Sequence, residues 1–249
     1  MRKLTVVMVA AMLLLAGCSG GGTDGTPTNN TTAADEMNMS QPSDPSELTN
    51  LSSGEGDAFA NATRIDATLF NGTEQLRLLT ENDTAAGTQL LRINTSTGGT
   101  TTLYSTGDYT ALRNTTSGEV EYGGPGSNIG FGVGFLSVFI LAGSAGYAGL
   151  VEWDAAGTTT VDGESAFVYE SDSLNETAFD ERQRLNDGFE QGDVQSTDGR
   201  MVIGPDGRIY SINVEIETAD GTFGTDMSIG YDDITITKPG WVDESEAPN

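Results

Sequence analysis

The chain has 249 residues, with 37 Asp or Glu, 11 Lys or Arg and no His, so its formal net charge is −26. Nucleic-acid binding depends on Lys and Arg side chains that neutralise phosphates, and this charge excludes a nucleic-acid partner. Without His, the commonest general base and the commonest transition-metal ligand are missing, and the single Cys cannot form an intrachain disulfide. We therefore expect no catalytic residue, no metal site and no cofactor.

The N-terminus has the layout of a secretory signal. Arg2 and Lys3 precede an apolar run over residues 4–16, which is shorter than the ~20 residues needed to span a bilayer. The run closes on Leu15-Ala16-Gly17-Cys18, which resembles the lipobox of prokaryotic lipoproteins. The resemblance implies cleavage before Cys18 and a lipid on its thiol, which would hold the protein on the outer, extracellular face of the cell membrane. The alternative is that Cys18 is an incidental small residue of the signal.

Residues 19–56 have the composition of a disordered tether that follows the signal of residues 1–18. Ser, Gly, Thr, Asn, Asp and Pro dominate this segment, and it contains neither Lys nor Arg. It carries too little apolar surface to fold alone. We expect it to lift the following domain away from the membrane.

Asn-x-Ser/Thr sequons are frequent, and in a secreted chain they are candidate glycosylation sites. The ten sequons begin at Asn29, Asn30, Asn38, Asn50, Asn61, Asn71, Asn82, Asn94, Asn114 and Asn175. Because tether residues are exposed, we expect Asn29, Asn30, Asn38 and Asn50 to be modified first.

Residues 57–242 are predicted to form a single β-rich domain, which an acidic tail over residues 243–249 follows. Strands are expected over residues 75–80, 88–94 and 100–104, with a short fourth over 109–112 and a hairpin around residues 161–170. Gly adopts positive φ easily, and Asn or Asp before it favours a hairpin turn. Such turns are expected at Asn71-Gly72, Asp162-Gly163, Asp198-Gly199, Asp206-Gly207 and Asp220-Gly221.

The segment from Ile129 to Val151 contains no charged residue. By length it could span a membrane, but no cation flanks it, and a span would separate the strands on its two sides. We expect instead one or two short apolar helices, or a lid, on the apolar face of the sheet. A further helix is expected after Ser173-Leu174-Asn175-Glu176, which has the spacing of a capping box.

The C-terminal region has the period of two that is typical of strands with one apolar face. Tyr210, Ile212, Val214 and Ile216 alternate with polar residues, and so do Phe223, Met227, Ile229 and Tyr231. A last strand is expected over residues 234–237.

Two patterns in this region resemble a known superfamily. Asp206-Gly207-Arg208-Ile209-Tyr210-Ser211 begins one long strand, and the next closes on Tyr231-Asp232-Asp233-Ile234-Thr235-Ile236-Thr237-Lys238-Pro239. This order resembles the end of the lipoprotein-carrier superfamily of LolA-like and LppX/LprG-like proteins, and haloarchaeal surface lipoproteins are similar. The resemblance implies an α+β, mostly β fold, in which a strongly curved antiparallel sheet, a half-barrel, carries a few helices on its concave face. It also implies that acyl chains or glycolipids are held between the sheet and the helices.

The composition also resembles that of proteins from extreme halophiles, because acidic residues and Thr abound while Lys occurs only at Lys3 and Lys238. At about 1 M salt the Debye length is about 3 Å, which removes most of the self-repulsion of such a surface. The alternative is an acidic extracellular protein of ordinary salinity.

These observations favour a membrane-anchored, non-catalytic module that binds a lipid or another amphiphile. The alternative is a structural or interaction protein of the cell envelope without a small ligand, and no feature identifies its protein partner. The residues expected to line an apolar cavity are Phe135, Phe139, Tyr210, Ile212, Val214, Ile216, Phe223, Met227 and Ile229.

Overall fold

The computed structural model describes residues 40–48, 59, 61–96, 98–125, 127–129, 131–183 and 191–248, without the side chains of Phe131, Phe135 and residues 181–183. The signal, Cys18 and the sequons at Asn29, Asn30, Asn38 and Asn50 lie outside the described residues.

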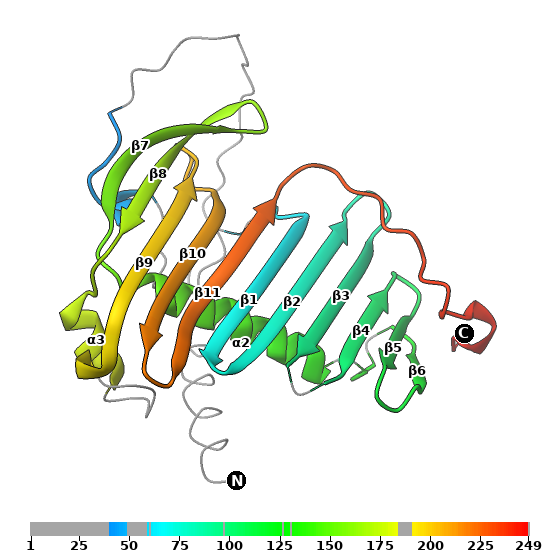
Figure 1. The fold of residues 1–249 in the computed structure, drawn as a ribbon. Coiled ribbons are helices and arrows are strands. Elements are labelled where there is room, and N and C mark those ends of the chain that lie inside the picture. The colour runs from blue at the N-terminus through cyan, green and yellow to red at the C-terminus, as the bar shows by residue number, and fades with distance from the viewer. Residues whose placement is uncertain are drawn as a thin grey trace. The chain divides into compact units, whose positions relative to one another are not determined.

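A single antiparallel sheet of eleven strands, together with few helices, makes up the fold, which is mostly β (Figure 1). Its strand order is β6-β5-β4-β3-β2-β1-β11-β10-β9-β8-β7, and the sheet does not close because β6 and β7 are its two edges. The strands are β1 (Arg64–Gly72), β2 (Glu74–Asp83), β3 (Thr88–Thr95), β4 (Thr100–Ser105), β5 (Thr110–Asn114), β6 (Val120–Gly123), β7 (Asp154–Val161), β8 (Glu164–Ser171), β9 (Val194–Ile203), β10 (Ile209–Thr218) and β11 (Gly221–Gly230). The helices are α2 (Phe131–Ala148) and α3 (Glu176–Gln183), and the short 3₁₀ turns are η1 (Pro45–Glu47), η2 (Gln191–Asp193) and η3 (Glu244–Glu246).

Two meanders build this sheet, and α2 lies in the connection between them. Strands β1 to β6 run outward to one edge, and β7 to β11 return from the other edge until β11 pairs with β1. The register places Ala67 opposite Met227. Helix α2 contacts β11, β1 and β10 and, to a smaller extent, β2 and β3. The charge-free segment is therefore one helix that lies on a face of the sheet.

Four of the five predicted turns connect adjacent strands. In the β7–β8 turn, Asp162 and Gly163 have φ values of 52° and 87°, as a two-residue hairpin of the right twist requires. The prediction for Asp198-Gly199 was wrong, since both residues lie inside β9. A Cβ on Gly199 would come within 2.9 Å of the Ser171 Cβ atom, so this glycine serves close packing and not a turn.

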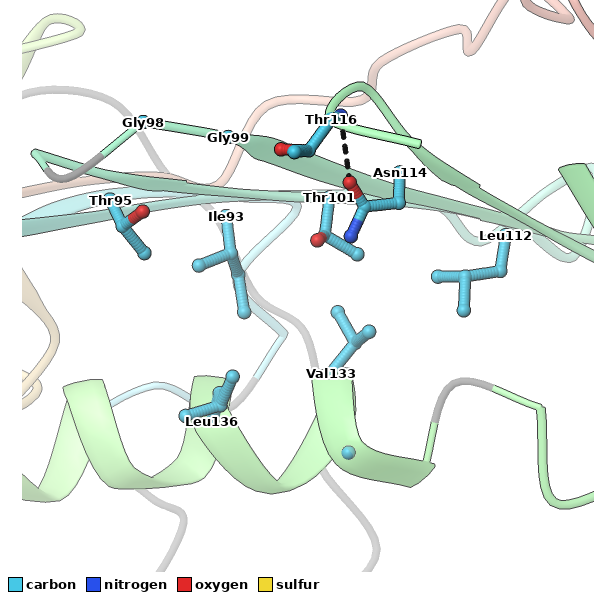
Figure 2. A pocket seen from close by; sticks show the side chains of 11 residues that line it. Ile93, Thr95, Gly98, Gly99, Thr101, Leu112, Asn114, Thr116, Val133 and Leu136 are labelled. Carbon is cyan, nitrogen blue, oxygen red and sulfur yellow. Dashed lines mark hydrogen bonds between the residues drawn. The ribbon is translucent and has the colours of Figure 1, made fainter. Parts of the chain in front are cut away.

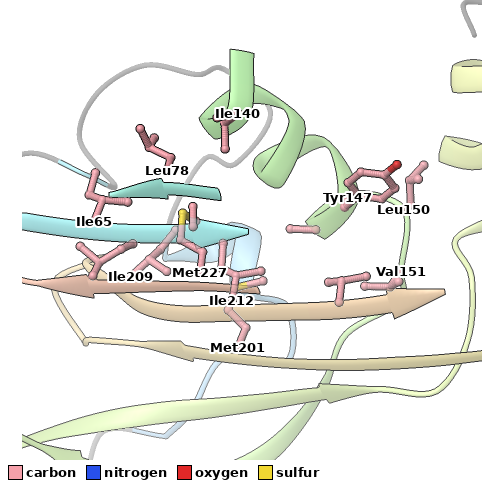
Figure 3. Close-up of a cluster of buried hydrophobic side chains, with 14 of the residues drawn as sticks. Ile65, Leu78, Ile140, Tyr147, Leu150, Val151, Met201, Ile209, Ile212 and Met227 are labelled. Atoms are coloured by element: carbon pink, nitrogen blue, oxygen red, sulfur yellow. The ribbon is translucent and has the colours of Figure 1, made fainter. Parts of the chain in front are cut away.

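The main core fills the space between the sheet and α2 (Figure 3). The alternating residues of the central strands face the helix, and Ala67, Leu78, Ile212 and Met227 are all at most 1% exposed. This face is the apolar side that the period of two predicted.

The opposite face of the β3–β5 flank carries a second, smaller core. Leu90, Tyr104 and Ala111 pack there with Val242 of the C-terminal segment. The strand predicted over residues 234–237 is wrong: these residues join no ladder. The Ile236 backbone N–H donates instead to the Asp83 carboxylate at 3.3 Å.

Two further details differ from the sequence expectations. Helix α3 begins one position after Asn175, whose side chain accepts from the Ala178 N–H at 3.0 Å, so Asn175 takes the capping role expected of Ser173. Within the range predicted as a tether, residues 41–48 pack on the sheet. The Gln41 side chain donates to the Val168 carbonyl at 2.7 Å, and Pro45 is buried.

Candidate functional site

Helix α2 contacts the sheet closely along its C-terminal half. Ile140 and Ser144 have no exposed surface, and the Ser144 hydroxyl donates to the Ile140 carbonyl at 2.9 Å. The Thr225 hydroxyl of β11, also fully buried, donates to Ser144 Oγ at 2.7 Å. The half of α2 that follows Phe139 is thus bound to β11 by packing and by a buried hydrogen bond.

The N-terminal half of α2 is more open. Leu136 and Val138 are 42% and 51% exposed, and they are the large apolar side chains that the described residues leave most accessible. They are two residues apart on the helix and therefore point in different directions, so only Leu136 faces the neighbouring strands.

Between this half of α2 and strands β3–β5 lies a cavity of about 350 Å³ (Figure 2). Its apolar part is formed by Ile93, Leu112, Val133 and Leu136. The remaining lining residues are uncharged: Thr95, Gly98, Gly99, Thr101, Asn114, Thr116 and Gly132. The volume falls near the lower end of the range of small-molecule sites, about 300–1,000 Å³.

The polar side of the cavity has hydrogen-bonding groups that the fold does not use. Asn114 accepts from the Thr116 N–H through its side-chain oxygen at 2.8 Å. No hydrogen bond with another described residue engages its Nδ2, which points away from Thr116 toward the cavity in Figure 2. The Thr101 side chain also lies on the α2 side of the sheet. These groups can donate to an oxygen of a bound molecule.

Most residues that were expected to line a cavity lie instead in the filled core. Six of them are at most 7% exposed: Ile212, Val214, Ile216, Phe223, Met227 and Ile229. None of these six is among the residues that line the cavity next to β3–β5. Phe139 is half-buried on α2, and Phe135 belongs to the same helix with a side chain outside the described part.

Tyr210 belongs to a different environment. The pairing of β10 with β9 shifts in register between Ile209 and Ser211. At this point Ile209 is fully buried, and Tyr210 is half-buried. The Tyr210 hydroxyl donates to Glu164 at 3.3 Å, and its ring meets that of Tyr231 edge-on. Burial raises the pKa of Tyr231 to about 12, and its hydroxyl donates to the Ile209 carbonyl at 2.9 Å.

The residues of the observed cavity were not singled out from the sequence. A usable signal existed in the strand predicted over residues 88–94. Leu91 and Ile93 share one face of this strand, and Thr95, the next residue but one, continues the same face. The change from apolar to polar along that face marks the point where the core ends. What the sequence could not show is that the N-terminal end of α2 lies over this point.

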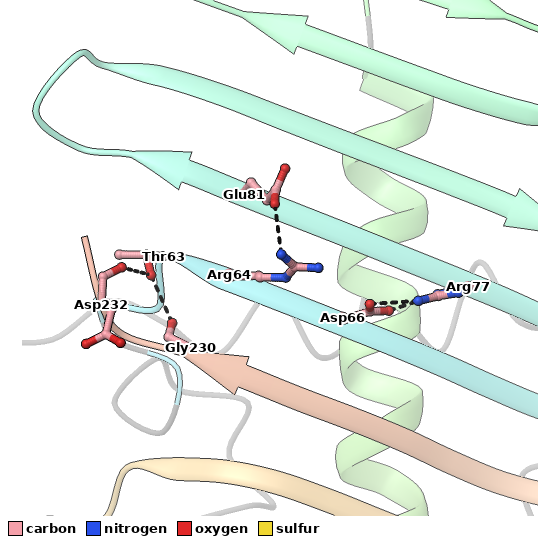
Figure 4. Close-up of polar contacts among 7 residues, drawn as sticks. All are labelled: Thr63, Arg64, Asp66, Arg77, Glu81, Gly230 and Asp232. Atoms are coloured by element: carbon pink, nitrogen blue, oxygen red, sulfur yellow. Dashed lines mark hydrogen bonds and ion pairs between the residues drawn. The ribbon is translucent and has the colours of Figure 1, made fainter. Parts of the chain in front are cut away.

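Over β1 and β2, the sheet face opposite α2 is polar and carries surface ion pairs (Figure 4). Arg77 contacts Asp66 at 2.8 Å, and its hydrogen bond holds the pKa of the Asp66 carboxyl below the usual value. Arg64 pairs with Glu81 at 3.3 Å. Neither pair borders the cavity, and exposed pairs of this kind contribute about 0–1 kcal/mol.

The described sequons differ in what the fold leaves available. Asn82 donates to the Ala62 carbonyl, and Asn175 caps α3, so both side chains have structural roles. Asn61, Asn71 and Asn114 are exposed. A bulky glycan needs an exposed and unobstructed acceptor nitrogen, which favours Asn61 and Asn71 over Asn114, whose Nδ2 faces the cavity.

Within the described residues, no group of three His, Cys, Asp or Glu side chains could hold a metal ion. Among the helices of the same residues, none combines the length and apolarity needed to cross a membrane.

Comparison with solved structures gives matches of low sequence identity. The crystal structure of LprF from Mycobacterium bovis has 12% identity and a TM-score of 0.38, covering 80% of this chain and 99% of its own. That of lipoprotein LppX from Mycobacterium tuberculosis has 13% identity and a TM-score of 0.33, covering 78% and 99%. No curated protein matches the chain in sequence. A family model matches residues 3–245, nearly the whole chain, and the protein therefore belongs to DUF7537, a family of unknown function.

Proposed function

We propose that this protein is a lipid-anchored, non-catalytic module that binds a lipid or another amphiphile in the cavity between α2 and strands β3–β5. The observation that carries the proposal is the lining of this cavity, which combines apolar side chains with hydrogen-bond donors that the fold does not use. Water fills an apolar hollow poorly, and an alkyl segment would gain about 25 cal/mol for each Å² of apolar surface it removes from water.

The neighbouring surface supports the same reading. Leu136 lines the cavity and is itself 42% exposed. An alkyl segment that contacts Leu136 in the cavity would cover part of this exposed apolar surface. In this proposal the sheet is a half-barrel whose concave side holds α2.

The anchor and the habitat belong to the proposal too. Cys18 carries the lipid that holds the module on the outer face of the cell membrane, with residues 19–40 as a glycosylated tether, and the cell is an extreme halophile. Replacement of Cys18→Ser should release the chain from washed membranes or leave it uncleaved. Unchanged lipid modification and retention would contradict the anchor.

The halophilic part has its own test. Raising the salt from about 0.1 M to about 1 M shortens the Debye length from about 10 Å to about 3 Å, so repulsion among the surplus carboxylates should weaken and the free energy of unfolding should rise. Thermal unfolding at a series of KCl concentrations measures this change in stability. A melting temperature that does not change with salt contradicts adaptation to high salt.

Ligand binding can be tested with two glycines of α2. A Cβ at Gly132 or at Gly134 would meet no atom within 4 Å, but only Gly132 lines the cavity. The full chain and its Gly132→Leu and Gly134→Leu variants are purified in high salt, and non-covalent lipid is extracted and counted by mass spectrometry. We expect lipid on the wild type and on Gly134→Leu, and at least tenfold less on Gly132→Leu.

The filled core favours one second candidate, a structural or interaction protein of the envelope without a small ligand. Six of the residues predicted to line a cavity are packed in that core, so no large apolar chamber exists among them. If wild type and Gly132→Leu both carry no lipid, this candidate replaces the first. Crosslinking in intact cells should then recover a stable protein partner.

A further inference from the structure

The cavity next to β3–β5 is unusual for this chain because no charged side chain of the described residues lines it. The chain has 37 acidic and 11 basic residues, yet the eleven described residues of the lining are all uncharged. A second hollow, next to the β2–β3 turn, contains Asp83 and Asp233 and follows the general composition instead. We propose that the cavity selects an amphiphile with one alkyl chain and an uncharged, oxygen-containing head group. This inference rests on the proposed function and narrows its ligand.

Burial of an ionised head group would be unfavourable there. Arg92 and Arg113 are the basic residues of β3 and β5, but each alternates with residues that line the cavity, so their side chains leave from the other face of the sheet. A carboxylate or phosphate would lose its hydration without gaining a cation. An ammonium head group would likewise find no carboxylate in the lining.

An uncharged oxygen, in contrast, finds donors already in place. The Asn114 side-chain oxygen is held by the Thr116 N–H, which fixes the amide and leaves its Nδ2 directed toward the cavity (Figure 2). Thr101 presents a hydroxyl on the same side of the sheet. A hydroxyl, ester or amide oxygen of the ligand can accept from both. Ile93 and Leu112 of the sheet and Val133 of the facing helix α2 then contact the alkyl chain (Figure 2).

The volume is suited to one alkyl chain. At about 30 Å³ for each group of the size of a water molecule, the cavity holds roughly a dozen non-hydrogen atoms. This is enough for one medium-length alkyl segment with a small head group. Two or three acyl chains would have to leave most of their length outside.

Three probes with the same alkyl chain test the head group. The full chain is titrated calorimetrically in high salt at about pH 8 with 1-decanol, decanoate and decyltrimethylammonium, all below micelle-forming concentrations. We expect 1-decanol to bind at least tenfold more tightly than either ion. Equal affinity for all three, or tighter binding of an ion, overturns the head-group inference and leaves amphiphile binding intact. Binding of none of the three, together with lipid-free wild-type protein, overturns the proposed function itself.

Two variants place the selectivity at the named side chains. Protein made in a host without N-glycosylation avoids a glycan on Asn114. Asn114→Leu and Thr101→Val should each weaken 1-decanol binding roughly three- to tenfold, the loss of one neutral hydrogen bond, while decanoate binding changes little. Thr102→Val is the matched control, because this residue is next to Thr101 on β4 but faces the other side of the sheet. The ratio of the 1-decanol affinity to the decanoate affinity is compared among the three variants. If this ratio in Asn114→Leu and in Thr101→Val equals that in Thr102→Val, the side chains of Asn114 and Thr101 do not determine head-group selectivity.

Discussion

The two halves of α2 lie on the same sheet and have equally uncharged sequences, but they meet the strands differently. In the C-terminal half, Ile140 and Ser144 are completely buried, and Ser144 accepts a hydrogen bond from Thr225 of β11. In the N-terminal half, Leu136 is 42% exposed and borders the cavity. Hydropathy alone therefore does not decide which part of an apolar helix becomes core.

Small residues explain much of this difference. Gly143 brings the helix so close to β1 that a Cβ there would lie 3.2 Å from the methyl groups of Leu69. At Gly132 and Gly134 the same atom would meet nothing within 4 Å. One helix is thus packed tightly on the sheet at one end and forms a wall of the cavity at the other.

The largest expected contrast comes from truncating one large side chain in each half. Ile140→Ala removes a fully buried side chain and should lower the free energy of unfolding by about 2–5 kcal/mol. Leu136→Ala acts on an exposed side chain and should cost about 0.5 kcal/mol or less. Urea unfolding at fixed high salt measures both, and equal losses would mean that the two halves are equally packed.

The next pair of substitutions should change the free energy of unfolding in opposite directions in the two halves. Gly143→Leu forces a side chain into occupied space and should destabilise the protein by about 1–3 kcal/mol. Gly134→Leu adds helix propensity in open space and should stabilise it by about 0.5–1 kcal/mol. The same unfolding assay applies, and stabilisation by both substitutions would show that α2 is not held tightly at Gly143.

A double-mutant cycle isolates the polar contact of the anchored half. Ser144→Ala and Thr225→Val each remove one hydroxyl of the buried 2.7 Å hydrogen bond, and their coupling energy should be roughly 1 kcal/mol. Ser137→Ala is the control, because among the described residues its hydroxyl bonds to the Gly134 carbonyl within α2 and to no strand. Its coupling to Thr225→Val should be near zero, and a coupling as large as that of Ser144 would show a general effect on the helix.

The sequence predicted the β-rich character, most hairpins and the position of the apolar helix, because these depend on local period and turn chemistry. Strand β1 was missed although it is central, since its pairing with β11 joins residues that are far apart in the chain. The cavity was missed for the same reason. Ile212 and Met227 alternate correctly, but alternation reports only which face is apolar, and α2 fills that face over β10 and β11. Which end of α2 stays open depends on contacts such as Gly143 with Leu69.

The smallest effect is expected on the polar face of the sheet, away from both halves of α2. The Arg77 hydrogen bond lowers the pKa of Asp66 in the folded protein, so this pair stabilises the fold above the unfolded value of 3.8, and the contribution is lost as the pH falls through the lowered pKa. Because Arg77 is largely exposed, Arg77→Leu should cost less than about 1 kcal/mol at neutral pH.

The pH dependence separates this pair from the other carboxylates that titrate in the same range. The difference in unfolding free energy between the wild type and Arg77→Leu should shrink toward zero as the pH falls from 3.8 through the lowered pKa of Asp66, at constant ionic strength. Arg92→Leu, which removes an exposed arginine that has no ion pair within the described residues, should show no such trend. Binding of 1-decanol should be unchanged in both variants, because neither arginine borders the cavity. A change in 1-decanol binding with Arg77→Leu would mean that the polar face and the cavity are coupled through β1 and β2. The packed half of α2 and the half that borders the cavity would then not act independently.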